Sequence, residues 1–185
     1  MKRSYLLSLI FAVSWLLIKI LFYFLGDSEL GFNIGVSTNL IFILAIVALV
    51  LWTKYRDPST KKDLITDVKD TSKPALLYVI LMIIFLTAHY SFIDTTYLTN
   101  RMNIRYNLEV DNVRDDVHYT KMVENNLLLQ QDKVTKEEYL TTIKEKIEEQ
   151  YNVKTIAFGG FIVFTITTFI YSFLISFLFR NFLFK

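Results

Sequence analysis

The chain lacks the residue types on which most catalytic and metal centres depend. Its 185 residues include no cysteine and only two histidines, His89 and His118. Without cysteine there is no thiolate nucleophile or ligand, and neither histidine has ligand spacing to other side chains. Acidic pairs such as Glu137 and Glu138 have no histidine base near them in the sequence. We therefore expect no enzyme, no cofactor and no metal site, and we also expect no nucleic-acid partner.

Charged residues are nearly missing from four long apolar stretches, at about 5–25, 36–52, 75–98 and 155–179. Each meets or approaches the roughly 20 residues with which a helix crosses about 30 Å of hydrocarbon. A water-soluble protein would have to bury all four helices, and the rest of a 185-residue chain is too short to cover them. The sequence therefore predicts an all-α membrane protein, with four transmembrane helices in one membrane domain spanning 1–185.

Basic residues predict the orientation, because short basic loops stay in the cytoplasm. They precede the first span and follow the last, and the loop at 53–74 carries Lys54, Arg56, Lys61, Lys62, Lys69 and Lys73. The connection at 26–35 has no basic residue. We expect both termini and the loop at 53–74 to be cytoplasmic, and residues 99–154 to form an extracytoplasmic helical insert.

Within the cytoplasmic loop, Leu64, Ile65 and Val68 share one side of a helical turn, and either Ser59 or Thr60 before them could be the cap. This pattern predicts a short helix on the inner membrane surface, after which Pro74 would lie in the first turn of the third span. Two roles remain open for the basic residues of this loop. They are plain topology determinants, or they contact anionic headgroups.

The second part of the external insert has the pattern of an amphipathic helix. Thr135 and Glu138 have capping-box spacing, and apolar residues recur at Leu140, Ile143, Ile147 and Tyr151. No proline or turn cluster separates this helix from the fourth span, so we expect it to continue into that span. Its apolar stripe must pack on the preceding stretch, on a protein partner or on a second copy of the chain.

The stretch at 102–110 is ambiguous, because apolar residues alternate with polar ones. The apolar positions are Met102, Ile104, Tyr106, Leu108 and Val110. Alternation indicates a half-buried strand, whereas a helix would extend the third span. An isolated strand is unstable and no second strand is visible in the sequence, so helix is favoured.

Ionisable residues inside the spans are costly in hydrocarbon and require an explanation. With helix ends at Leu25 and Leu98, Lys19 lies about 9 Å, Asp94 about 6 Å and His89 about 14 Å from the external boundary. We expect a polar cluster in which Lys19 pairs with Asp94; the alternative is that Lys19 extends to the interface while Asp94 is solvated. His89 is either a hydrogen-bonded packing residue or a proton-responsive group.

The fourth span carries small residues at helical spacing, namely Gly160, Thr168, Ser172 and Ser176. Small residues on one face let a neighbouring helix approach closely. The sequence predicts a helix-packing face here.

Several features occur together. Two spans precede the basic cytoplasmic connection and two follow it, "FIDTTYL" stands at 92–98, and an acidic helical insert carries "TKEEY" at 135–139. In these features the whole chain resembles a bacterial family of small four-span integral membrane proteins of unknown function, found mainly in Gram-negative lineages. The resemblance implies a bacterial inner-membrane protein and no known activity. The family's insert is rich in helix, so 102–110 is where this sequence fits least well.

Two functions remain as hypotheses besides the disfavoured enzyme. The first is an accessory or scaffolding protein that binds a protein partner, or a second copy, through residues 99–154. The second is a small ion- or proton-coupled transporter or channel that uses Lys19, His89 and Asp94. The second is weakened because no broken helix and no polar residues are apparent in the inner half of the spans.

Overall fold

The computed structural model describes residues 2–57, 59, 63–113, 115, 117, 119–120, 123 and 135–183. All regular structure in these residues is helical, as predicted. The elements are α1 (Lys2–Phe24), α2 (Ser28–Arg56), α3 (Leu64–Ala88), η1 (His89–Ile93), α4 (Tyr97–Asn112), α7 (Lys136–Gln150), α8 (Val153–Leu178) and η2 (Phe179–Leu183), of which η1 and η2 are π-helices. The ambiguous stretch at 102–110 lies inside α4, so the favoured helix is confirmed.

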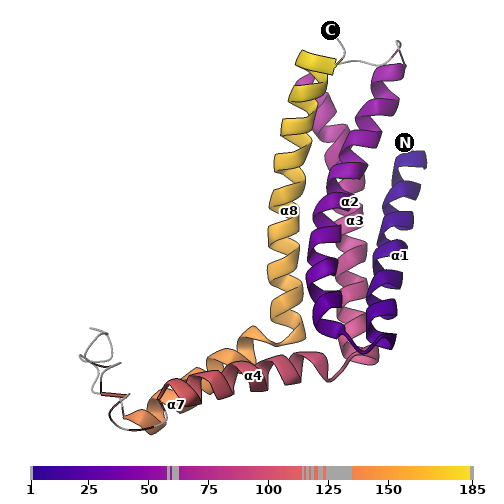
Figure 1. Ribbon diagram of the computed structural model, residues 1–185. Coiled ribbons are helices and arrows are strands. Elements are labelled where there is room, and N and C mark those ends of the chain that lie inside the picture. Colours follow the sequence, from indigo (N-terminus) through magenta and orange to yellow (C-terminus); the bar gives the residue numbers. More distant parts are fainter. Residues whose placement is uncertain are drawn as a thin grey trace. The chain divides into compact units, whose positions relative to one another are not determined.

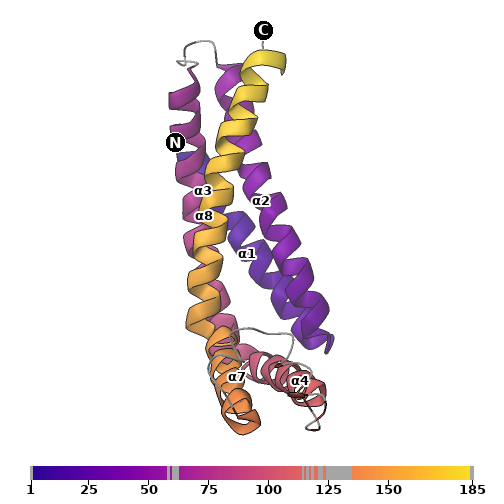
Figure 2. The same ribbon diagram turned by 90° about the vertical axis from the view of Figure 1, so that its left-hand side faces the viewer.

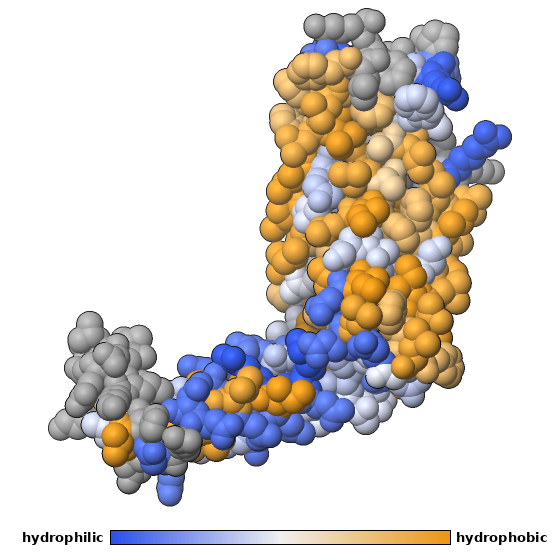
Figure 3. Space-filling view, viewed as in Figure 1, coloured by the Kyte–Doolittle hydropathy of each residue, from blue (hydrophilic) through white to orange (hydrophobic). Residues whose placement is uncertain are grey.

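Four helices are long and apolar enough to cross a membrane: α1, α2, α3 with η1, and α8 with η2. They lie side by side in Figures 1 and 2, and hydrophobic residues cover most of the face shown in Figure 3. The chain divides into two compact units. We call residues 1–94 with 157–185 the membrane unit, and residues 95–156 the arm unit.

In the membrane unit, α1, α2 and α3 pack on one another around large buried side chains that include Trp15, Ile43, Leu51, Tyr78 and Met82. Glycines allow α1 and α2 to approach closely. A Cβ atom on Gly31 would lie 2.6 Å from Cβ of Phe22, and one on Gly35 would lie 3.2 Å from Cδ of Lys19.

The second span is longer than predicted because its helix begins well before residue 36. Asp27 caps α2 by accepting a hydrogen bond from the Leu30 amide at 2.9 Å, so α2 starts at Ser28. The predicted connection at 26–35 is reduced accordingly. The third span is shorter at its far end, because η1 ends at Ile93 and α4 begins only at Tyr97.

The prediction of a separate surface helix before the third span was wrong. Asp63, and not Ser59, caps the helix by accepting a hydrogen bond from the Thr66 amide, and α3 then continues unbroken through Pro74. Pro74 is therefore inside the helix and not in its first turn. Its carbonyl oxygen accepts a hydrogen bond from the Ser8 hydroxyl at 2.6 Å, which joins α1 to α3 at this point.

In the arm unit, α4 and α7 pack against each other (Figure 2). The capping box of Thr135 and Glu138 is formed as predicted. The apolar stripe of α7 is covered within the unit: Ile147 is buried, and Leu140, Ile143 and Tyr151 are half-buried. The expected continuation into the fourth span was wrong, because Tyr151 forms a turn and the side chain of Asn152 accepts a hydrogen bond from the Lys154 amide.

The predicted packing face of α8 is hidden from solvent within the membrane unit. Thr168, Ser172 and Ser176 are fully buried, and a Cβ atom on Gly160 would lie 3.3 Å from Cδ1 of Ile83 in α3. The three hydroxyl residues are therefore buried, and the role of the four residues as a helix-packing face stays a prediction.

Candidate functional site

The first polar site of the membrane unit surrounds the buried ammonium group of Lys19. Lys19 Nζ donates a hydrogen bond to the Tyr90 hydroxyl at 2.8 Å. The same nitrogen lies 5.0 Å from the ring centre of Tyr90 and 5.8 Å from that of Phe32, within the range of cation–π attraction. An ammonium group has three N–H donors, so one hydrogen bond leaves donor capacity unused. We call Lys19, His89, Tyr90 and Asp94 the Lys19 cluster.

The structure brings Lys19, His89 and Asp94 into one region, but Lys19 forms no direct ion pair with Asp94 among the described residues. Asp94 acts on Lys19 electrostatically, and both Lys19 and Asp94 act on His89. The expected ion pair is thus replaced by a hydrogen bond to Tyr90. The sequence did not point to Tyr90, because a tyrosine in an apolar span is usually a packing residue.

His89 lies at the start of the π-helix that ends the third span. Its side chain is buried, and its Nδ1 atom has no hydrogen-bond partner among the described residues. The rings of Tyr23 and Tyr90 approach it edge to face, with centroids 6.4 and 5.1 Å away. Single-turn π-helices occur frequently at functional sites, and a buried polar atom without a partner requires an explanation. The Lys19 cluster therefore retains unused hydrogen-bonding capacity. His118 lies outside the described residues.

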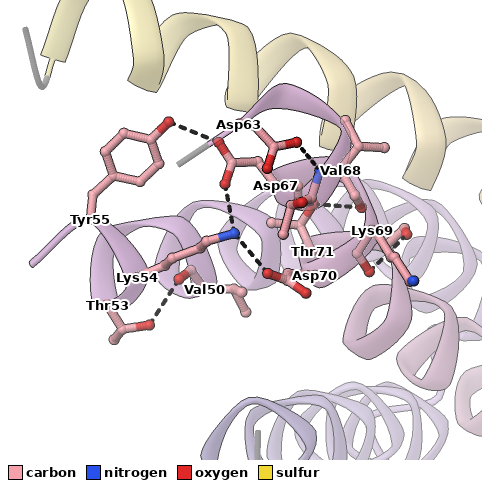
Figure 4. A network of polar contacts seen from close by, with 12 residues as sticks. Val50, Thr53, Lys54, Tyr55, Asp63, Asp67, Val68, Lys69, Asp70 and Thr71 are labelled. Carbon is pink, nitrogen blue, oxygen red and sulfur yellow. Dashed lines mark hydrogen bonds and ion pairs between the residues drawn. The ribbon is translucent and has the colours of Figure 1, made fainter. Parts of the chain in front are cut away.

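The second polar site joins α2 to α3 at the end of the membrane unit near the α2–α3 connection (Figure 4). Lys54 Nζ lies 2.8 Å from Asp67 and 2.7 Å from Asp70, and the Tyr55 hydroxyl donates to Asp67 at 2.8 Å. Asp67 is fully buried. We call these four residues the Lys54 cluster. Its buried carboxylate has both a cation and a hydroxyl donor.

Sequence reasoning missed the Lys54 cluster and treated its members as loop charges. The available signal was the position of Lys54 at the end of one span and of two aspartates before the next, since α2 and α3 run in opposite directions. The glycines of α2 give a similar signal, because Gly31 and Gly35 have the spacing that lets membrane helices approach closely.

Buried polar groups also occur between the two clusters. The Tyr78 hydroxyl donates to the side-chain oxygen of Asn39 at 2.5 Å, and Trp15 Nε1 donates to the Gly35 carbonyl at 3.0 Å. The expectation that the half of the spans away from Lys19 has no polar residues was therefore wrong. It failed because serine, tyrosine and asparagine hardly lower the apolar character of a 20-residue span.

The described residues contain no group of three or more histidine, cysteine, aspartate or glutamate side chains that could hold a metal ion.

The four apolar helices define the chain as a helical multi-pass membrane protein. Comparisons with protein-family models, with curated proteins and with solved structures find no match to the chain. Its function must therefore be inferred from its own residues.

Proposed function

We propose that the chain is an accessory or scaffolding protein of a bacterial inner membrane, and that it binds a protein partner or a second copy through the arm unit. The observation that carries the proposal is apolar exposure on α4. Ile104 and Leu108 lie one turn apart and are 55% and 51% exposed. Met102 and Tyr106 are half-buried and Val113 is buried on the opposite side of the helical projection.

The residues around Ile104 and Leu108 favour a protein as the partner that binds there. Figure 3 shows a hydrophobic patch on the arm unit with hydrophilic residues around it. Exposed polar residues lie beside Ile104 and Leu108 on α4, including Arg105 and Asn107. An apolar centre with a polar rim is the usual composition of a protein-binding surface. The stripe of α7 does not serve this purpose, because it is covered within the arm unit.

The proposed orientation rests on charge. Exposed Arg3, Arg56, Lys69, Lys73 and Arg180 all belong to the end of the membrane unit at which α1 begins and α2 and α8 end (Figure 1). At the other end of these helices, where α1 and η1 end and α2 begins, the charged residues include Asp27, Glu29 and Asp94. Basic ends remain in the cytoplasm. This distribution supports cytoplasmic termini and an extracytoplasmic arm unit, and the resemblance noted above supports the bacterial inner membrane.

Photo-crosslinking tests the proposal. A photoreactive amino acid at Leu108 should crosslink a protein in native membranes, whereas the same amino acid at Thr142, an exposed position on α7, should crosslink much less. A crosslinked band at twice the mass of the chain would identify a homo-oligomer. Equal crosslinking at the two positions, or none at Leu108, would contradict the proposal.

A second candidate is a small ion- or proton-coupled transporter that uses Lys19, His89 and Asp94. It is favoured by the unpartnered Nδ1 atom of His89 and by the buried polar residues that continue beyond the Lys19 cluster, among them Asn39, Tyr78 and Thr71. Proton flux into liposomes, followed with an enclosed pH-sensitive dye, tests this function. Flux no faster than in protein-free liposomes would remove it, and flux unchanged by His89→Gln would remove the role of His89.

A further inference from the structure

At the start of α3, acidic and basic side chains differ in the contacts that they make. The acidic residues Asp63, Asp67 and Asp70 are engaged within the protein: Asp63 caps α3, and the other two bind Lys54. Figure 4 shows the amino group of Lys69 pointing away from this network. The three carboxylates near this end of α3 therefore make contacts with groups other than Lys69.

Lys69 and Lys73 lie on the exposed side of α3, and Asp70 is about one turn before Lys73. Both side chains are exposed, and neither forms an ion pair among the described residues. They are four residues apart, so they lie one above the other on the helix. Two unpaired ammonium groups on adjacent turns attract a single anion from both turns.

The lysine face continues directly into apolar surface. Ile80 and Ile84 are 45% and 55% exposed, and they lie seven and eleven residues after Lys73. These spacings return to the same side of a helix, and seven residues correspond to about 10 Å along its axis. One face of α3 thus presents cationic groups and, about 10 Å further along, branched apolar side chains. This is the order of polar headgroup and acyl chain in a phospholipid.

We propose that Lys69 and Lys73 form a binding surface for an anionic phospholipid, with its phosphate between the two ammonium groups and its acyl chains along Ile80 and Ile84. Charge complementarity favours the anionic headgroup, because both ammonium groups are exposed and neither is paired with a carboxylate among the described residues. Continuity with the lipid-facing side of α3 selects a lipid over a soluble anion. Juxtamembrane lysines attract anionic lipids electrostatically. The proposal is independent of the partner proposed for the arm unit.

Native mass spectrometry of the full chain from detergent provides the test, with phosphatidylglycerol and phosphatidylcholine of identical acyl chains as probes. The chain should retain phosphatidylglycerol in preference to phosphatidylcholine. Replacing both lysines, as Lys69→Gln with Lys73→Gln, should weaken phosphatidylglycerol binding roughly 25-fold, since each lysine near a headgroup contributes roughly fivefold. Phosphatidylcholine binding should not change.

Two matched variants complete the test. Lys144→Gln with Lys146→Gln removes the same charge from exposed positions on α7 and should leave lipid binding unchanged. Lys69→Arg with Lys73→Arg should retain the preference, which excludes a folding defect as the cause of the loss. Equal retention of the two lipids by the unaltered chain would overturn the proposal. So would a loss in the α7 variant as large as that in the α3 variant.

Discussion

The membrane unit and the arm unit distribute polarity in opposite ways. The membrane unit buries Lys19, Asp67, His89 and Asp94 while exposing many large apolar side chains, whereas the arm unit buries Ile147 and Val113 and exposes most of its charges. Each distribution matches a different medium: hydrocarbon tolerates exposed leucine but no unpaired charge, and water has the opposite preference. Exceptions to the local pattern are therefore the most informative residues of each unit.

Each unit has its exceptions. In the membrane unit, Asp67 of the Lys54 cluster has an ion pair with Lys54 and accepts a hydrogen bond from Tyr55, whereas Nδ1 of His89 has no hydrogen-bond partner among the described residues. In the arm unit, Ile104 and Leu108 remain exposed. The contrast teaches that the Lys54 cluster is structural, whereas the Lys19 cluster and the exposed pair on α4 are where function is expected.

The largest effect should come from removing the cation of the satisfied cluster. Lys54→Met leaves fully buried Asp67 without its cation, and breaking a buried pair costs about 3–5 kcal/mol. Unfolding in mixed micelles measures this change. Lys69→Met should alter stability by less than about 0.5 kcal/mol, as exposed substitutions usually do. Similar losses for the two variants would contradict a structural role for the Lys54 cluster.

In the arm unit, the effect of replacing isoleucine by alanine can be compared at a buried position and at an exposed one. Ile147→Ala should destabilise the unit by about 2–4 kcal/mol, because it removes a buried side chain and leaves a cavity. Ile104→Ala should cost less than about 0.5 kcal/mol. Hydrogen exchange of α4 and α7 reports both values, and a large effect at Ile104 would show that this side chain packs within the unit.

Replacing one tyrosine in each polar cluster by phenylalanine compares how much each hydroxyl group contributes to stability. Tyr90→Phe removes the hydrogen bond that the Lys19 ammonium donates to the Tyr90 hydroxyl, and a hydrogen bond to a charged group contributes about 1.5–3 kcal/mol. Tyr55→Phe should cost less, about 1 kcal/mol, because Asp67 retains Lys54. Micelle unfolding of both variants provides the comparison. A larger loss for Tyr55→Phe would reverse the assignment of the satisfied and unsatisfied clusters.

The smallest effect concerns the capping box of α7. Hydrogen bonds from the backbone and then the side chain of Thr135 lower the pKa of Glu138 from its ordinary value of 4.5. The folded pKa is therefore below the unfolded one, so the stabilisation is present above pH 4.5 and disappears as the pH falls through the folded pKa. Hydrogen exchange in the first turn of α7 should rise below pH 4.5 relative to Glu138→Gln measured at the same pH. If the ratio of the exchange rates of the unaltered chain and of Glu138→Gln did not change with pH, the prediction would be contradicted.

Local features were predictable from the sequence. The capping box and the apolar stripe of α7 depend on residues within one helix, and the four spans depend only on length and apolar content. The alternation at 102–110 was ambiguous because α4 carries two apolar stripes: Met102 and Tyr106 on its packed side, and Ile104 and Leu108 on its exposed side. Their interleaving imitates a strand.

Features that depend on helix register were not predictable. The contact between Lys54 and Asp67 depends on how α2 and α3 align, and the hydrogen bond from Lys19 to Tyr90 depends on how α1 aligns with η1. Sequence spacing gives the depth of a residue in a span, but it does not give the partner. Lys61 and Lys62, which contributed to the predicted orientation, lie outside the described residues.

The proposed topology, with an extracytoplasmic arm unit and a cytoplasmic α2–α3 connection, can be tested directly. The chain has no cysteine, so single cysteines can be introduced at Ser59 and Thr142 and labelled with a membrane-impermeant maleimide. In intact bacterial spheroplasts, Thr142→Cys should be labelled, and Ser59→Cys should be labelled only after permeabilisation. Labelling of both positions from the same side would contradict the crossing, and the reversed pattern would contradict the proposed orientation.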